Sequence, residues 1–544
     1  MGGRFVLPAP GVAPIVRPVL LPRSSAGDRA PILVGWLLGL ACLVYLLALP
    51  PTLNIADESF ILYEAKRVWQ GQALYRDFFD FLTPGAFYFY ALAYAIGGVS
   101  ITSARMATSL LHALSVVCTY FLALHVASMG EAIIAGLLVV VIAVPVWSMA
   151  SHHWIATTFG LATAAVLLAR RWQDSWRARP AAAGALAGLV VCTHQARGVW
   201  LIAWLAVTIP LLTLTRADAD RWGRCLRELM WTAVGGAAVC FPILGFAVWR
   251  SSLAEMLYAT HTWVTTNYRN YNVGFMRWAG FLFSSELKYT ALWFFEVIPK
   301  LLAIEALALF WALWRYGLAS QAVRAALLLL ALSAVGSIYY FPDIVHVAFV
   351  VPFVLVVCAG MIYRARTAVA WAGTPVARAV VRLGWAAALV VVLAKGWINF
   401  GFAWEDNPVL YETAFGTLAG RAEQRDTIRD LRQQLHVDAA DPPRLFAYPH
   451  DAWLYLALPA DNPTPFSLLR PIYNTPEQFQ TAIKKLDADP QAIIVLNLFA
   501  GLFAKKGDPF MPYLNANWHD AGGIGPGVIL GAPLYRLFIR NREK

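Results

Sequence analysis

Charged residues are scarce in this sequence. They make up 14% of its 544 residues, whereas hydrophobic residues make up 59%. An ordinary soluble domain carries about 25% charged residues, so the composition excludes a cytosolic globular enzyme. The scarcity is uneven, because residues 1–403 hold 29 Lys and Arg against 16 Asp and Glu, while residues 404–544 hold 14 against 16. We therefore predict a membrane domain over residues 1–403 and a small soluble domain over residues 404–544.

Several familiar site motifs are missing as well. None of the six cysteines is placed for an extracytoplasmic disulfide, and the sequence has no CxxC, HExxH or GxxxxGK[ST] pattern. The glycine-rich run 522–527 contains Pro526 and precedes no helical pattern, which favours a surface turn over a phosphate loop. The net charge of +11 arises in the membrane part, so it indicates membrane orientation and no nucleic-acid partner.

What the sequence does contain is a series of apolar stretches. Eleven of them are candidates to cross the lipid bilayer, whose hydrocarbon core is about 30 Å thick. They cover residues 32–50, 105–127, 132–150, 155–169, 181–195, 199–214, 230–249, 291–314, 325–341, 344–363 and 384–403. A twelfth stretch, residues 84–98, is short, rich in aromatic residues and bounded by Pro84 and Gly97-Gly98, which predicts a helix that lies in the membrane interface.

The soluble tail combines two kinds of pattern. A charged helical run covers residues 422–435, and strand-like pieces cover residues 444–448 and 492–496. The predicted fold is thus an all-α polytopic membrane domain of about eleven transmembrane helices plus one interfacial helix, followed by a small C-terminal α/β domain.

Arginine placement sets the orientation. With residues 84–98 not crossing, the N-terminus and four loops on the same side hold 18 Arg, whereas the opposite loops hold nine Lys and Arg. Because Lys and Arg near span ends resist translocation, the N-terminus is predicted to be cytoplasmic and the tail extracytoplasmic. Residues 1–31 then form an uncleaved signal anchor, and the loops 51–104 and 250–290 face outward with the tail.

Two adjacent carboxylates follow the first span. Asp57 and Glu58 are the candidate catalytic residues, because they open a helical pattern at the water edge of the membrane, where a carboxylate is suited to removing a proton from a hydroxyl nucleophile. The alternative is that Asp57 is an N-cap of the helix. Neighbours on a helix point about 100° apart, so the two carboxylates are not expected to share one task.

The motifs of this first loop resemble those of a known family. They are Asp57-Glu58, Gly71-x-x-Leu74-Tyr75-Arg76-Asp77, Thr83-Pro84-Gly85-x-x-Tyr88, Gly97 and Arg105. The loop resembles that of the C-type membrane glycosyltransferases, in the branch of protein O-mannosyltransferases and of the aminoarabinose and galacturonosyl transferases of lipid A. The resemblance implies a multi-pass enzyme of the bacterial inner membrane that takes a sugar from a polyprenyl-phosphate donor on the outer face, with Asp57 catalytic. The acceptor is then a lipid such as lipid A, a cell-wall glycan or a protein.

A departing lipid phosphate needs positive charge or hydrogen-bond donors. The outward candidates are Arg197, Lys66 and Arg269, with Arg197 preferred because it stands between two apolar spans. Gln195 in the same turn is a candidate substrate contact, as is Asp77. Each cation has an alternative role in binding lipid headgroups or in ending a helix.

Histidines stand where relatives commonly carry a second acidic residue. The turn 151–154 reads Ser-His-His-Trp, and no Asp or Glu occurs between Glu131 and Asp174. His152 and His153 are candidates to bind sugar or phosphate, or to ligate a divalent metal with Asp57; alternatively, water and backbone satisfy them. Asp343 and His346, three residues apart, form either a carboxylate-oriented imidazole or an N-cap beside a packed histidine.

Two other functions remain open. Glu296, Lys300 and Glu305 in the eighth span are the kind of buried ionisable residues that mark a transport path, which favours a transporter or a flippase for lipid-linked sugars. Against this, Glu296 and Lys300 are four residues apart and can pair. The third alternative is a glycan ligase or polymerase that uses diphosphate-linked donors.

Overall fold

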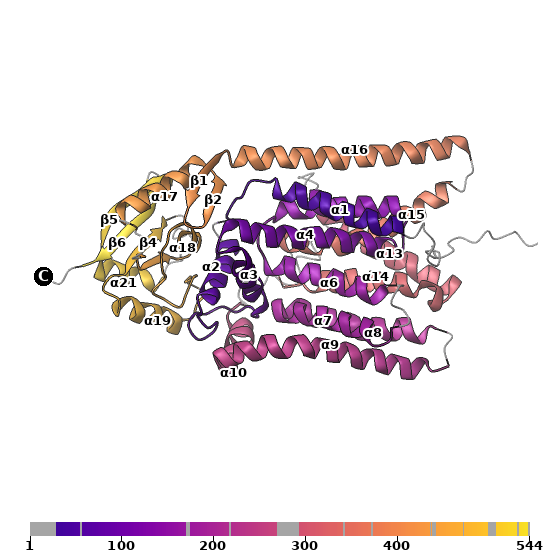
Figure 1. The fold of residues 1–544 in the computed structure, drawn as a ribbon, viewed down its shortest axis with the longest axis horizontal. Coiled ribbons are helices and arrows are strands. Elements are labelled where there is room, and N and C mark those ends of the chain that lie inside the picture. The colour runs from indigo at the N-terminus through magenta and orange to yellow at the C-terminus, as the bar shows by residue number, and fades with distance from the viewer. Residues whose placement is uncertain are drawn as a thin grey trace, which may run out of the picture.

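The fold is taken from a computed structural model. The structure describes residues 29–54, 57–169, 175–216, 219–268, 293–340, 343–370, 374–435, 437, 442–471, 473–498, 508–529 and 532–541. A helical bundle occupies one part of the molecule, and a small domain with a β-sheet covers one end of it (Figure 1).

All eleven predicted spans are helices. They are α1 (Arg29–Leu47), α4 (Ile101–Ala123), α5 (Met129–Leu138), α6 (His152–Leu168), α7 (Ala178–Thr193), α8 (Gln195–Leu214), α9 (Arg221–Arg250), α13 (Trp293–Tyr316), α14 (Leu318–Gly336), α15 (Ile344–Ala370) and α16 (Pro375–Asp406). Within the described residues nine are long and apolar enough to cross a membrane, α5 being extended to Val146 by a π turn and a 3-10 turn. The other two, α6 and α7, have 17 and 16 residues and run within the same bundle.

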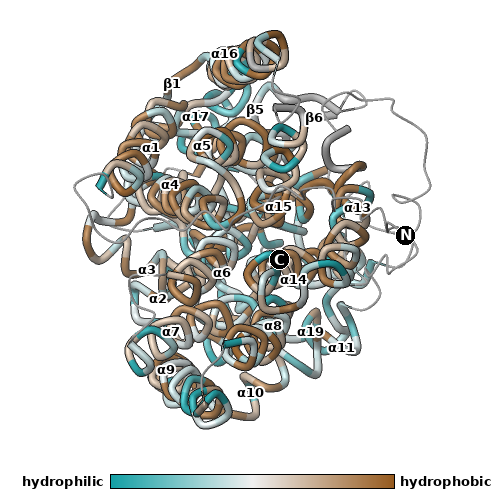
Figure 2. The backbone as a smooth tube through the Cα atoms, turned by 90° about the vertical axis from the view of Figure 1, so that its right-hand side faces the viewer, coloured by the Kyte–Doolittle hydropathy of each residue, from teal (hydrophilic) through white to brown (hydrophobic). Residues whose placement is uncertain are grey.

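Helix packing in the bundle depends on small residues. α15 is apolar along its length and lies among α4, α6, α13 and α14 in the view along the bundle (Figure 2). α7 and α9 approach so closely that a Cβ on Gly184 would lie 1.9 Å from the backbone oxygen of Thr232. A Cβ on Gly235 would lie equally close to the oxygen of Ala181. Small residues at such crossings allow the dispersion contacts that hold membrane helices together.

The first loop returns to the end of the bundle from which it starts. It contains α2 (Asp57–Trp69) and α3 (Gly85–Gly97), and α3 spans about 20 Å, too short to cross the membrane. Pro51 accepts a hydrogen bond from the N–H of Ala419, and the N–H of Ile101 donates to the oxygen of Phe415. Both ends of the loop therefore contact the same part of the tail, which agrees with the prediction that residues 84–98 do not cross; that α3 lies in the membrane interface stays a prediction.

The end of the bundle that carries the soluble domain is called the site end below. Because successive helices alternate in direction, the turns before α6, between α7 and α8, and between α14 and α15 also lie there. α10 (Leu253–Leu257), the π-helical turn Tyr258–Trp263 and α11 (Val264–Thr266) follow α9 at the same end. The predicted gathering of the polar turns on one side is thus seen in the fold.

The tail forms the predicted small α/β domain. Strands β1 (Val409–Thr413) and β2 (Gly416–Gly420) make a hairpin, and a second sheet has the order β3-β4-β6-β5. Its strands are β3 (Leu445–Tyr448), β4 (Ile493–Asn497), β5 (Trp518–Ile529) and β6 (Ala532–Arg540), with β3 and β4 parallel and the other pairs antiparallel. The helices are α17 (Ala422–Gln434), α18 (Trp453–Ala457), α19 (Pro476–Asp487) and α21 (Phe510–Asn517).

One local prediction in the tail is wrong. The run 522–527 is not a surface turn; it belongs to β5, which pairs with β6 and has register shifts between Asp520 and Gly522 and between Ile524 and Val528. Glycines at such irregularities admit positive φ angles, as at Gly522 and Gly525.

Arginine–glutamate pairs mark the opposite end of the bundle. Arg179 lies 2.6 Å from Glu228, and Arg366 lies 2.6 Å from Glu131. These arginines belong to the loops that carry the predicted cytoplasmic excess of positive charge. Which side of the membrane each end faces remains a prediction.

Candidate active site

Glu58 has a structural role, because its contacts hold neighbouring segments together. Its carboxylate is fully buried, lies 2.6 Å from a guanidinium nitrogen of Arg105 and accepts hydrogen bonds from the N–H groups of Asn54 and Ala150. These partners belong to the first loop, to α4 and to the turn before α6. Glu58 therefore joins three segments at the site end and is not available as a base, contrary to its inclusion among the predicted catalytic residues.

Asp57, one residue earlier, is exposed at the start of α2. Surrounding protein nevertheless removes water and raises the pKa of its carboxyl group, an effect that the nearby charges of His346 and Arg470 oppose and that of Asp343 reinforces. Asp57 thus faces residues from the start of α15 and from the soluble domain. A carboxylate with a raised pKa in such a junction is suited to accept a proton.

Asp343 and His346 form the predicted pair. Oδ1 of Asp343 lies 2.8 Å from Nδ1 of the His346 ring and also accepts a hydrogen bond of 2.8 Å from the His346 N–H. Burial acts to raise the pKa of Asp343, but the hydrogen bonds from His346 hold it below its usual value. Asp343 therefore both orients the imidazole of His346 and caps the start of α15, so the two alternatives given from the sequence occur together.

Three histidines converge beside this pair. The ring centroids of His152 and His153 are 4.0 Å apart, and that of His194 lies 5.1 and 4.7 Å from them. The His346 ring lies 4.7 Å from that of His153, so the cluster is continuous with the groups around Asp57. His194 joins from the turn between α7 and α8, and the sequence analysis did not single it out.

Arg197 lies next to the histidines, in the first turn of α8. It is buried, and its Nη1 donates to the Thr157 hydroxyl at 2.6 Å and to the oxygen of His153 at 3.2 Å. The guanidinium also lies over the Phe349 ring at 5.6 Å. Its Nε and Nη2 have no hydrogen-bond partner in the part of the chain that the structure describes. Two buried donors are thus available for an anion.

A half-open, mostly apolar pocket adjoins Arg197 between α6, α7, α8, α14 and α15. Apart from Arg197 and two serines its lining is apolar, and it consists of Ala156, Gly160, Val190, Arg197, Trp200, Leu201, Leu330, Ser333, Ala334, Ser337 and Phe353. A single guanidinium beside a mostly apolar pocket suits a ligand that has an anionic head and an apolar chain.

Solved structures resemble the chain over nearly its whole length. ArnT from Cupriavidus metallidurans gives a TM-score of 0.58 in the apo state and 0.54 bound to undecaprenyl phosphate, each at 14% sequence identity over 94% of this chain and 98% of that one. The archaeal oligosaccharyltransferase AglB from Archaeoglobus fulgidus, in complex with an inhibitory peptide and a dolichol-phosphate, gives 0.51 at 12% identity over 91% of this chain and 73% of AglB. The chain has the fold of the C-type membrane glycosyltransferases.

The resemblance recognised in the first loop is thereby confirmed at the level of the fold. At this sequence identity the similarity concerns the fold alone, so the chemistry has to be argued from the site. No protein-family profile matches the sequence, and no curated protein matches it.

Within this glycosyltransferase fold, the other predicted phosphate ligands are placed differently from Arg197. Nζ of Lys66 donates to the backbone oxygen of Tyr455 at 3.0 Å and so ties α2 to the soluble domain. Gln195 donates to the backbone oxygens of Phe81 and Thr260 at 3.1 and 3.4 Å. Arg269 lies outside the described residues.

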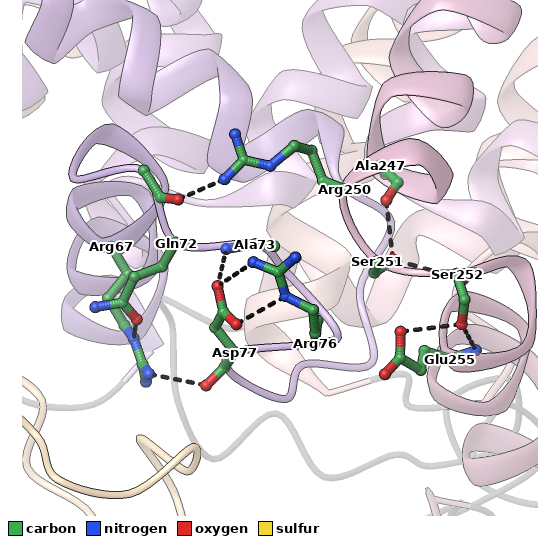
Figure 3. A network of polar contacts seen from close by, with 11 residues as sticks. Arg67, Gln72, Ala73, Arg76, Asp77, Ala247, Arg250, Ser251, Ser252 and Glu255 are labelled. Atoms are coloured by element: carbon green, nitrogen blue, oxygen red, sulfur yellow. Dashed lines mark hydrogen bonds and ion pairs between the residues drawn. The ribbon is translucent and has the colours of Figure 1, made fainter.

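Asp77 belongs to a network of polar contacts in the segment between α2 and α3 (Figure 3). Its carboxylate lies 2.9 Å from Nε of Arg76 and accepts a hydrogen bond of 2.7 Å from the N–H of Ala73. Its backbone oxygen accepts from Arg67, and Arg250 at the end of α9 donates to the oxygen of Gly71. Asp77 thus shapes the loop, and in the structure it is not part of the group around Asp57.

A buried carboxyl pair was missed by the sequence analysis. Glu64 on α2 and Asp80 share a hydrogen bond; burial raises the pKa of Asp80 to about 6, and burial together with the charge of Asp80 raises the pKa of Glu64 well above its usual value. Arg470 near Asp57 was missed too. The periodicity of α2 places Glu64 on a buried face, but no sequence signal pairs it with Asp80 or brings Arg470 to Asp57.

Proposed function

We propose that the protein is an inverting glycosyltransferase of the bacterial inner membrane. It transfers a sugar from a polyprenyl-phosphate donor to an envelope acceptor on the outer face. The acceptor is a lipid such as lipid A, a cell-wall glycan or a protein. The fold of the whole chain and the position of Asp57 at the site end support this assignment.

One observation carries the proposal. The buried guanidinium of Arg197, with two unpartnered donors in the described structure, lies at the boundary between a mostly apolar pocket and the polar groups around Asp57. A polyprenyl phosphate has the matching chemistry, since its chain is apolar and its phosphate accepts the bidentate donors that arginine offers. Among the predicted cations, Lys66 is bonded to a backbone oxygen and is less suited to this role.

The reaction then follows from the residues present. Asp57 accepts the proton of the acceptor hydroxyl as its oxygen attacks the anomeric carbon of the sugar from the side opposite the phosphate. The new C–O bond forms as the bond between that carbon and the phosphate oxygen breaks, and the polyprenyl phosphate leaves with the electron pair. Arg197 stabilises the negative charge that develops on the leaving phosphate.

The transport alternative receives less support from the structure. Glu305, the buried acid of α13, lies 2.7 Å from a guanidinium nitrogen of Arg324 and is also paired with Arg364. Both arginines lie at the end of the bundle away from the site, where the pairs join α13 to α14 and α15. Lys300 is exposed, and the side chain of Glu296 lies outside the described residues.

The test uses purified protein and matched donors. Lipid extracts or synthetic donors that carry the sugar on a polyprenyl monophosphate or on a diphosphate are incubated with an envelope fraction, and lipid products are measured by mass spectrometry. We expect release of polyprenyl monophosphate with the wild type and its loss with Arg197→Ala. Release of diphosphate instead would favour the ligase or polymerase, and transport of intact donor across vesicles without release would favour a flippase.

A further inference from the structure

His152, His153 and His194 bring three possible metal-ligand atoms together at the site end, where α6 and α8 begin. One ring-nitrogen ligand atom of each of His152, His153 and His194 lies within 4.8 Å of the others. Two of the histidines come from the start of α6 and the third from the turn between α7 and α8, so the fold brings together residues more than forty positions apart. Histidine nitrogens ligate zinc at about 2.0–2.1 Å, and three histidines are a common ligand set for this ion.

Each of the three histidines has a ring nitrogen without a hydrogen-bond partner in the described structure. His153 and His194 are 7% and 5% exposed, and neither Nδ1 has a hydrogen-bond partner among the described residues; the same is true of Nδ1 of His152. Buried polar atoms are normally paired, so three unpaired imidazole nitrogens in one place point to a bound species. This observation is independent of the clustering of the rings.

His194 has the outer contact that metal-binding histidines have. Its Nε2 lies 3.2 Å from the Tyr340 hydroxyl, and its Nδ1 has no hydrogen-bond partner among the described residues. A contact on the second ring nitrogen fixes the tautomer and the ring orientation of a ligand. The ring of His153 is held in place differently, stacked on Phe349 at 4.6 Å.

We propose that His152, His153 and His194 bind one divalent transition metal of the zinc class, with one coordination position open. Imidazole ligands suit Zn²⁺, Co²⁺, Ni²⁺ or Cu²⁺, whereas Mg²⁺ and Mn²⁺ prefer carboxylate oxygens. The predicted pairing of these histidines with Asp57 is not needed, because Asp57 is not among the three ligand groups. Resting on the proposed function, the open position takes an oxygen of the donor phosphate, which also offsets the repulsion between the metal and Arg197.

The experiment measures metal directly. Protein purified without a histidine tag is stripped with a chelator, loaded with Zn²⁺ or Co²⁺ and dialysed; metal content is measured by mass spectrometry and Co²⁺ coordination by visible absorption. We expect about one metal per wild-type chain, with the absorption of a four-coordinate site. Retention should fall at least tenfold in His194→Ala and in His153→Gln.

Matched controls separate the site from general effects. Tyr340→Phe removes the outer hydrogen bond and should weaken metal affinity roughly 10- to 100-fold, whereas Tyr339→Phe, next to it and exposed, should not. His261→Ala removes an exposed histidine at the same end and should leave retention unchanged. Size-exclusion profiles show whether each variant is folded. A wild type without metal, or a folded His194→Ala that retains a full equivalent, would overturn the proposal.

The coupling to phosphate has its own readout. Adding a short-chain polyprenyl phosphate should raise Co²⁺ affinity and change its absorption, and the matching polyprenol without phosphate should do neither. An unchanged Co²⁺ affinity would overturn the proposal that phosphate takes the open coordination position. The metal content would still test whether the three histidines bind a metal. Failure of sugar transfer alone, with metal retained, would count against the proposed function and not against this site.

Discussion

At the scale of single residues, the adjacent carboxylates Asp57 and Glu58 differ in burial and in their partners. Glu58 is fully buried and paired with Arg105, whereas Asp57 is exposed and faces charged groups from α15 and from the soluble domain. The sequence indicated that the two would differ, because neighbours on a helix point in different directions. It did not indicate which of the two would be buried, since that depends on Arg105, 47 positions away from Glu58.

The raised pKa of Asp57 gives a pH prediction. As a base, Asp57 acts only when ionised, and its ionised fraction falls as the pH falls through its pKa. Removal of water by the surrounding protein raises that pKa above the ordinary aspartate value of about 3.9, although the side chain keeps some exposure, so the acid limb of kcat/KM should lie above this value. The check is sugar transfer measured against pH at constant ionic strength. A rate that stays level down to about pH 4 would contradict the assignment of Asp57 as the base.

At the scale of elements, the first loop is anchored to the bundle by the Glu58–Arg105 pair. Arg105→Ala leaves a buried carboxylate without its partner, and breaking such a pair costs about 3 to 5 kcal/mol. We expect a lower midpoint of thermal unfolding and loss of activity, because α2 carries Asp57. The control is Arg76→Ala, which removes an exposed pair with Asp77 and should change stability by less than about 1 kcal/mol. Equal midpoints for the two variants would refute the anchoring role.

The crossing of α7 and α9 gives a second prediction at this scale. Gly184→Leu places a side chain where even a Cβ would lie 1.9 Å from a backbone oxygen, so the helices must separate. We expect a marked loss of folded protein in detergent, measured by size exclusion and thermal unfolding. Gly245→Leu on the same α9 is the matched control, since nothing lies within 4 Å of its Cβ position. If the two variants behave alike, the close approach does not stabilise the bundle.

Element prediction from the sequence succeeded where one local pattern was enough. The eleven apolar stretches and the short aromatic helix α3 follow from run length, and the Asp343–His346 pair follows from spacing on one helix. The prediction of a surface turn at residues 522–527 was wrong, because glycine and proline favour a turn locally whereas pairing with β6 keeps the segment in β5. The contacts between His194 and Tyr340 and between Glu64 and Asp80 join distant segments and leave no local pattern.

At the scale of the whole molecule, the soluble domain lies at one end of the bundle together with the turns that precede α6 and α8 (Figure 1). The paired Arg179 and Arg366 belong to the start of α7 and the end of α15, and so to the opposite end. The positive-inside rule then predicts that the site end is extracytoplasmic. A reporter that is active only outside the cytoplasm should be active when fused after Lys544 and inactive when fused in the turn at Gly317. The reverse pattern would place the site on the cytoplasmic face and contradict the predicted orientation.

Asp57 is proposed to act as the base while a lipid-linked sugar is transferred to an acceptor of the cell envelope. The most direct measurement is mass spectrometry of envelope lipids, glycans and proteins from a deletion strain that carries the wild type, Asp57→Asn or Asp77→Asn at equal protein levels. The account predicts one sugar-bearing species that is present with the wild type and with Asp77→Asn, and absent with Asp57→Asn and in the deletion strain. An envelope that is the same in all four strains, or full activity with Asp57→Asn, would contradict it.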